Sequence, residues 1–158
     1  LHGETFKRGL GKFHFFPFEE SHELTEHGTE YPLILTRGRI LEHYNCGTMT
    51  RRTGNALIVT EDYVAIHPQD ASDRDIGEGD FVSIKSACGE VTIKARITEE
   101  IRPGVVYTTF HFPEAMVNNV TGEGHDEETL CPECKVVAVE VEKVRARVAA
   151  ERLEAVVG

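Results

Sequence analysis

The sequence lacks a hydrophobic run long enough to cross a membrane. No window of its 158 residues approaches the roughly 18 consecutive apolar residues that a transmembrane helix needs. The first residues, LHGETFKRGLGKF, also lack the apolar centre of a signal peptide. These two absences predict a protein without membrane insertion.

Cysteine and positive charge are both scarce. The four cysteines do not form a dense disulfide framework, which favours a reducing, cytoplasmic location. The 17 basic and 27 acidic side chains give a net charge of −10. Because a field of that sign repels nucleic acid and anionic membranes, neither is expected as a partner. An anionic ligand must therefore be held by local groups.

The motifs of several common enzyme classes and metal sites are also missing. No Ser-His-Asp order, GxSxG turn, HExxH helix, glycine-rich dinucleotide fingerprint or P-loop is present. The single CxxC, Cys131 to Cys134, could join His111 or His125 at a zinc ion, but a structural zinc site usually needs four ligands. We therefore expect no metal site, two thiols packed beside the last strand, and no catalytic residue, since Cys46 has no evident base.

What the sequence does contain is one cationic segment. Residues 36–52, TRGRILEHYNCGTMTRR, carry four arginines and one glutamate, a net charge of +3 in an acidic chain. The segment follows an apolar strand that breaks at Gly38. A cationic loop with threonine and asparagine side chains suits an anion with many acceptor oxygens, such as a pyrophosphate. A solvated polar loop is the alternative.

Hydrophobic periodicity and turn residues predict a mainly β domain. The clearest signal is a hairpin, whose second strand alternates apolar and polar residues and whose turn is expected at Cys88-Gly89. A short helix is expected to begin at Pro68. The segments 19–30, 47–55 and 114–128 look like a linker and two loops. About seven strands suggest a closed barrel or a sandwich, at 12–18, 32–36, 63–67, 81–86, 90–98, 105–110 and 135–144.

Four motifs in the same order resemble the C-terminal molybdopterin-dinucleotide-binding domain of the dimethyl sulfoxide reductase superfamily. They are YPLILTRGRILEHYNCGTMTRR, VAIHPQDASDRDIGEGDFVSIKSACGEVTIKARIT, RPGVVYTTFHFPEAMVNNVT and CPECKVVAVEVEK. The likeness spans residues 6–144 and looks closest to formate dehydrogenase catalytic (alpha) subunits. It implies a six-stranded double-psi β-barrel with short peripheral helices at 31–144, after an arm and linker at 1–30 and before a C-terminal helix at 145–158.

The resemblance also implies a ligand. The barrel would bind one guanine dinucleotide arm of a bis-molybdopterin guanine dinucleotide cofactor that carries molybdenum or tungsten. The sequence departs from the family at Arg74 and Asp75, where the short helix normally has a leucine and then a glycine. Carried over by position, the expected cofactor-binding residues are Thr36, Gly38, Arg39, His43, Asn45, Cys46, Thr48, His111, Asn118 and Lys135.

The family context further implies a larger oxidoreductase that interconverts formate and carbon dioxide. Because the chain does not start with Met, we expect a fragment. The residue that ligates the metal and any iron–sulfur cluster would lie upstream, so the fragment alone should be inactive. Expected partners are the remaining domains of the parent catalytic subunit and possible electron-transfer subunits.

Three alternatives stay open at this point. The chain could be a separate small barrel subunit, as in formylmethanofuran dehydrogenase-type complexes. It could belong to a nitrate reductase, whose domain shares the first motif. It could also be a barrel that has lost the cofactor and serves as an interaction module.

Overall fold

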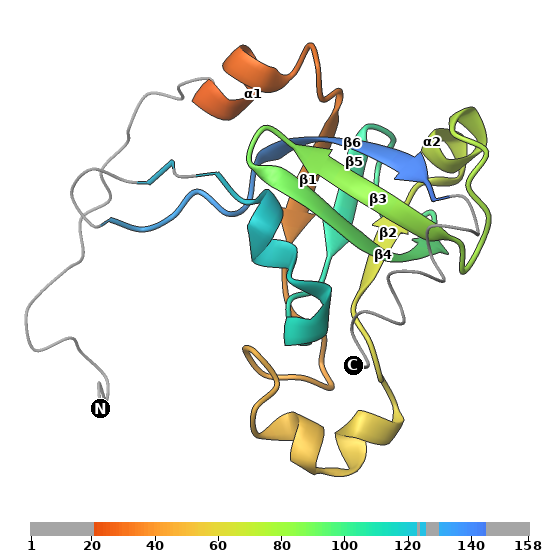
Figure 1. The fold of residues 1–158 in the computed structure, drawn as a ribbon. Coiled ribbons are helices and arrows are strands. Elements are labelled where there is room, and N and C mark those ends of the chain that lie inside the picture. Colours follow the sequence, from red (N-terminus) through yellow and green to blue (C-terminus); the bar gives the residue numbers. More distant parts are fainter. Residues whose placement is uncertain (1–20, 123, 126–129, 145–158) are drawn as a thin grey trace, which may run out of the picture.

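A closed β-barrel forms the centre of the computed structural model, which describes residues 21–122, 124–125 and 130–144 (Figure 1). Within those ranges six strands close in the order β1-β5-β2-β4-β3-β6. This confirms the mainly β, six-stranded barrel, while its double-psi topology stays a prediction. The expected strand at 12–18 and the C-terminal helix at 145–158 lie outside the described residues. The strands are β1 Leu33–Arg37, β2 Tyr63–Ile66, β3 Phe81–Ser86, β4 Gly89–Ile97, β5 Val105–Thr108 and β6 Val137–Lys143.

Alternate side chains of the strands fill the barrel. In the β3–β4 hairpin, the antiparallel register pairs Val82 with Ile93 and Ile84 with Val91, and all four side chains are buried. The period-two pattern in the sequence therefore corresponds to one face inside the barrel and one facing out. Burying an aliphatic side chain of this size contributes about 1.5–3 kcal/mol, so these pairs are a main source of stability.

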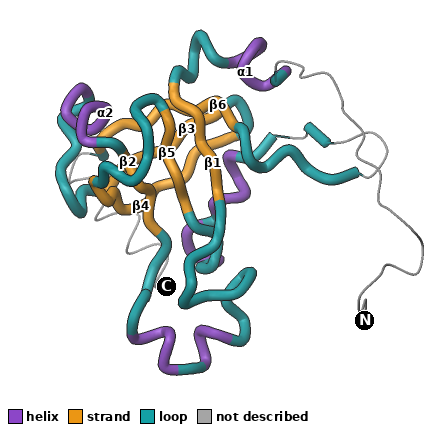
Figure 2. The backbone as a smooth tube through the Cα atoms, turned by 180° about the vertical axis from the view of Figure 1, so that it is seen from behind, coloured by secondary structure: helices purple, strands orange, loops and turns teal. Residues whose placement is uncertain are grey.

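One end of the barrel collects several segments that are distant in sequence. Strands β1 and β5 are parallel with Arg37 opposite Thr108, so both strands end at the same edge. The connection from β1 to β2 projects from this end with two short helices, η1 Thr50–Arg52 and η2 Gly54–Leu57 (Figure 2). After β5 come two more short helices, η3 Pro113–Ala115 and η4 Val117–Val120. The expected loops at 47–55 and 114–128 thus contain 3-10 turns.

Two α-helices lie outside the barrel. Helix α2, Pro68–Asp73, begins at the expected proline. It is followed by Asp75 in a left-handed conformation (φ 54°), which glycine adopts at no steric cost; this agrees with the glycine that the family resemblance led us to expect there. Helix α1, His22–His27, corrects the prediction of a linker at 19–30. Its acidic composition hid a tertiary contact, because a Glu23 carboxylate oxygen accepts a hydrogen bond from the amide of Ala138 in β6 (3.1 Å).

The hairpin turn and the cysteines also differ from expectation. The turn is Ala87–Cys88, and Gly89 already belongs to β4. A Cβ atom at Gly89 would lie 2.6 Å from the carbonyl oxygen of Asn119, so the glycine allows η4 to approach rather than the chain to turn. The expectation of two packed thiols is wrong for Cys131, which is exposed because β6 begins only at Val137.

Two kinds of feature are missing from the part of the chain that the structure describes. None of its helices is long and apolar enough to span a membrane. It also contains no group of three or more His, Cys, Asp or Glu side chains that could hold a metal ion.

Candidate functional site

Three distant segments meet at the end of strand β1. Arg37, the last residue of β1, donates a hydrogen bond through its guanidinium to the side-chain oxygen of Asn118 in η4. Lys135, just before β6, donates from its ammonium group to the carbonyl oxygen of Arg37. Residues from the first, third and fourth motifs are therefore adjacent in space. Asn118 and Lys135 were expected at the site, whereas Arg37 was not singled out.

Gly38, directly after β1, lies against Tyr107. A Cβ atom at Gly38 would stand 2.6 Å from the Tyr107 hydroxyl oxygen. That hydroxyl donates a hydrogen bond to the carbonyl oxygen of Arg39 (2.9 Å), and the Gly38 amide donates to the Thr108 carbonyl (3.1 Å). The glycine is needed here for packing, and its own N–H group is already used. Thr36, on the opposite face of β1 from Arg37, is partly exposed.

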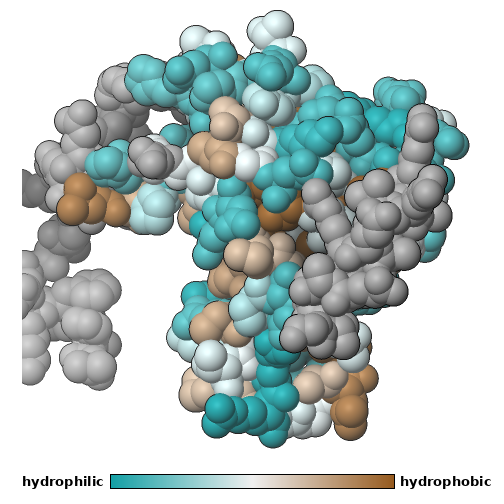
Figure 3. Space-filling view, in the orientation of Figure 1, coloured by the Kyte–Doolittle hydropathy of each residue, from teal (hydrophilic) through white to brown (hydrophobic). Residues whose placement is uncertain are grey.

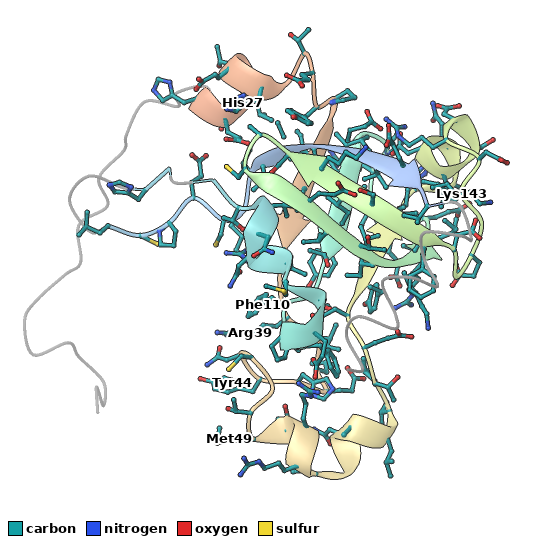
Figure 4. All side chains as sticks on the ribbon, in the orientation of Figure 1. His27, Arg39, Tyr44, Met49, Phe110 and Lys143 are labelled. Carbon is teal, nitrogen blue, oxygen red and sulfur yellow. The ribbon has the colours of Figure 1, made fainter. Side chains whose placement is uncertain are left out.

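Arg39 lies exposed at the start of the projecting loop. Its guanidinium donates to the side-chain oxygen of Asn45 (2.5 Å) and lies over the Tyr44 ring, 5.3 Å from the ring centroid. Figure 4 shows Arg39 and Tyr44 on the same side of this loop. Asn45 has a left-handed conformation (φ 49°) in a turn closed by the Gly47 amide and the Tyr44 carbonyl (3.0 Å). These contacts hold the guanidinium in one place at the surface.

Arg39 and the turn at residues 44–47 carry free backbone donors. The amide groups of Arg39, Asn45 and Cys46 have no acceptor among the described residues. The side chains of Cys46 and Thr48 are exposed. Free N–H groups beside a cationic side chain form a suitable surface for an anion.

The two histidines expected at the site lie beneath the loop. His43 is buried and bonds to the Thr50 hydroxyl (3.0 Å) and the Val59 carbonyl (2.9 Å). His111 is fully buried; its Nε2 accepts from the Ile40 amide (3.2 Å) and its Nδ1 donates to the Asn45 carbonyl (2.5 Å). Both ring nitrogens of each histidine are therefore occupied within the chain.

A buried carboxylate that the sequence analysis missed supports His111. Asp62 is only 3% exposed and accepts hydrogen bonds from the amides of His111 (3.0 Å) and Phe112 (2.9 Å). It also accepts from the Thr109 hydroxyl. The only signal in the sequence is an acidic residue directly before a buried strand, which is too common to single out. The sequence analysis also missed Tyr107, because in the sequence it is an ordinary aromatic residue of a strand.

The cations of this surface have no carboxylate partner among the described residues, and Arg52, Arg96 and Arg102 share that property. Five lysines and arginines of the described chain form ion pairs with carboxylates: Arg51, Arg74, Lys85, Lys94 and Lys143. Arg37, Arg39 and Lys135 instead bond only to amide or carbonyl oxygens. Their positive charges are therefore not neutralised within the described residues. We call Arg37, Arg39, Asn118 and Lys135 the cationic cluster.

Arg51 belongs to the scaffold of the loop. It pairs with Glu114 (2.6 Å) and lies over the Phe112 ring, 4.9 Å from its centroid. The hydrogen bond from Arg51 lowers the pKa of the Glu114 carboxyl below its ordinary value. Arg52, the next residue, is exposed and forms no ion pair among the described residues, so it is the better reference for an outer-loop charge.

The projecting loop exposes large apolar side chains among polar ones, and Figure 3 shows hydrophobic side chains beside hydrophilic ones on this part of the molecule. A hollow of about 490 Å³ lies beside β4 and η3, but none of the expected cofactor residues lines it. Exposed large apolar side chains of the loop are Leu41, Tyr44, Met49, Leu57 and Ile58.

Comparison with known proteins gives concordant findings. The family model described as "Molydopterin dinucleotide binding domain" matches residues 33–138. The chain is 43% identical over 145 residues to the F420-dependent formate dehydrogenase subunit alpha of Methanocaldococcus jannaschii, covering 91% of this chain and 22% of that protein. It is 36% identical over 115 residues to the assimilatory nitrate reductase catalytic subunit of Bacillus subtilis, covering 71% of this chain and 16% of that protein.

A solved structure has the same fold. Acetylene hydratase from Pelobacter acetylenicus matches with a TM-score of 0.65 at 15% identity, over 84% of this chain and 21% of that chain. Residues 1–158 therefore span about a fifth or less of the length of these relatives.

Proposed function

Since the chain belongs to the family of molydopterin dinucleotide binding domains, we propose that its cationic cluster holds the pyrophosphate of one guanine dinucleotide arm of a bis-molybdopterin cofactor. Arg37, Arg39 and Lys135 supply positive charge, and Asn118 supplies an amide that can donate and accept. When bound, such a cofactor supplies two-electron redox chemistry at molybdenum or tungsten. The protein side supplies binding and orientation.

The residues present fit this ligand. The observation that carries the proposal is that Lys135 meets Arg37 at the end of β1, two residues before Arg39, and that none of these three cations has a carboxylate partner in the described chain, although the chain is acidic. A dinucleotide pyrophosphate is an anion whose oxygens can accept from guanidinium groups in pairs. Free amides at Arg39, Asn45 and Cys46 add neutral donors to the same surface.

The expected site residues then take two different roles. Thr36, Thr48, Asn45 and Cys46 lie at the surface of β1 and the loop, where side-chain or backbone groups can meet the ribose, guanine or pterin. His43, His111 and Gly38 act from beneath, because their hydrogen bonds and packing hold the loop.

We assign the chain to a larger formate dehydrogenase-like oxidoreductase, in which the barrel covers one arm of the cofactor. The 43% identity to a formate dehydrogenase alpha subunit supports this parent. The exposed apolar side chains of the projecting loop support a contact with the remaining domains of the parent chain, because exposed apolar patches mark interaction surfaces. Electron-transfer subunits and a cytoplasmic location belong to the same proposal.

A nitrate reductase parent is the second candidate. The 36% identity to a nitrate reductase catalytic subunit favours it, but over a shorter part of the chain. The barrel carries the dinucleotide site in either case, so the substrate is decided by residues outside it.

Titration with guanosine diphosphate, followed by amide chemical shifts in two-dimensional NMR spectra, tests the proposed site. Saturable shifts are expected at Arg37, Arg39, Asn45 and Lys135, and they should weaken as salt rises because the contacts are ionic. Guanosine, which lacks the pyrophosphate, should shift these amides far less. Shifts confined to the hollow beside η3 would contradict the proposal.

A further inference from the structure

We propose that Asp62 and His111 form an internal clamp that positions Arg39 for the anion. Neither side chain reaches the surface, since both are at most 3% exposed. Their role is to hold the backbone that carries the exposed donors. The inference rests on the proposed function for its ligand, while the clamp itself is defined by hydrogen bonds within the chain.

The first step of the clamp joins the start of β2 to the segment after β5. The Asp62 carboxylate accepts from the amides of His111 and Phe112 and from the Thr109 hydroxyl. A buried carboxylate with three donors is well satisfied, and its removal leaves buried N–H groups without a partner. Asp62 thereby fixes the backbone position of His111.

The second step joins His111 to the loop that carries Arg39. The Ile40 amide can only donate and the Asn45 carbonyl can only accept, so His111 must carry its proton on Nδ1 and not on Nε2. The ring thus ties together residues 40 and 45, which stand on either side of the loop segment. The Asn45 side chain then bonds the Arg39 guanidinium.

His43 supports the same loop independently. Its Nε2 faces the Val59 carbonyl, which can only accept, so His43 carries its proton on Nε2. The two rings lie 5.7 Å apart and hold opposite tautomers. These hydrogen bonds therefore predict a distinct spectroscopic signature for each histidine, that of His111 from the clamp and that of His43 from its own partners.

The first measurement needs no mutation. Long-range proton–nitrogen NMR correlations of the imidazole rings should show His111 protonated at Nδ1 and His43 protonated at Nε2 near neutral pH. A proton on Nε2 of His111 would overturn the proposal, since that nitrogen could no longer accept from Ile40.

The second measurement compares two buried carboxylates at opposite ends of β5. Asp62→Asn replaces one acceptor oxygen by a donor, so hydrogen exchange of the Ile40 amide should become about five- to tenfold faster, the effect of one lost hydrogen bond. Asp70→Asn is the matched control, because Asp70 is buried and accepts from the Gly104 amide (2.8 Å) just before β5 begins. Asp70→Asn should leave the hydrogen-exchange rate of the Ile40 amide unchanged. If the Ile40 amide exchanged at the wild-type rate in Asp62→Asn, the proposed clamp would be overturned.

A third variant covers the case in which Asp62→Asn fails to fold. His111→Phe keeps a ring of similar shape but loses both hydrogen bonds, so it should accelerate Ile40 exchange in the same way and weaken guanosine diphosphate binding several-fold. If the exchange effects appear but the wild-type chain binds no guanosine diphosphate, the clamp stands and the proposed function fails. If the wild type binds and His111→Phe changes neither exchange nor affinity, the clamp fails alone.

Discussion

At the scale of single residues, the site depends on which cations are left without a carboxylate. Arg51 illustrates the difference, because it lies in the cationic segment of the sequence but its charge is used by Glu114. Arg37 and Lys135 are almost a hundred positions apart and meet at one carbonyl group. Local net charge in the sequence therefore cannot separate the structural arginine from those available to an anion, whereas the fold does.

The pair of Arg51 and Glu114 gives a prediction about pH. Its hydrogen bond lowers the Glu114 pKa in the folded state, so its stabilisation is present above about pH 4.3, the ordinary glutamate value. This stabilisation is lost as the pH falls through the lowered pKa of the Glu114 carboxyl in the folded state. Glu114→Gln should therefore melt at a lower temperature than the wild type at pH 7, and the difference should shrink toward pH 3. Thermal unfolding at several pH values measures this, and a difference that stays constant with pH would contradict it.

At the scale of elements, close approaches of the backbone decide where glycine is needed. Gly89→Ala should destabilise the chain by about 1–3 kcal/mol, because the new methyl group would collide with the Asn119 carbonyl and push η4 away. Urea unfolding monitored by circular dichroism measures the change. Gly54→Ala is the control, since no atom lies within 4 Å of its Cβ position. Equal free energies of unfolding for the two variants would contradict the prediction, because they would show that η4 moves away from the new methyl group without cost.

The elements also show which features of the fold can be predicted from sequence. The β4 strand and the start of α2 were predictable because period-two burial and a proline at the first helical turn are local signals. Helix α1 was not, since five of its six residues are polar and it is tied to β6 by a tertiary hydrogen bond from the Ala138 amide to Glu23. The turn at Ala87–Cys88 was misplaced by one residue because Gly89 serves a contact 30 positions away.

The residues of the site also divide into those that local sequence signals indicate and those that depend on tertiary contacts. Arg39 and Asn118 could be proposed from family motifs, because they lie in the first and the third motif. Asp62 and Tyr107 could not, since their roles depend on hydrogen bonds to residues 45 or more positions away, or on the packing against Gly38. Sequence reasoning thus proposed residues at a surface and missed the buried layer that supports them.

At the scale of the whole molecule, the chain provides a binding surface and no redox centre of its own in the residues described. Purified chain, analysed for metals, should show no formate-dependent reduction of artificial electron acceptors, because no group of metal-ligating side chains is present in the described ranges. The parent enzyme assayed in parallel is the positive control. Turnover that rises with the amount of pure chain would contradict this assignment and restore Cys46 as a catalytic candidate.

The central claim is that the cationic cluster, with Arg39 at the base of the loop, anchors the dinucleotide arm. The most direct test introduces Arg39→Ala, Arg39→Lys and Arg52→Ala into the parent enzyme and measures the guanine nucleotide released per protein on denaturation. A charge-assisted hydrogen bond contributes about 1.5–3 kcal/mol, so Arg39→Ala should weaken cofactor binding by roughly ten- to a hundredfold. Arg39→Lys should recover only part, because a point charge cannot reproduce the fork of a guanidinium. Arg52→Ala should retain the cofactor. Full retention in Arg39→Ala with loss in Arg52→Ala would contradict the account.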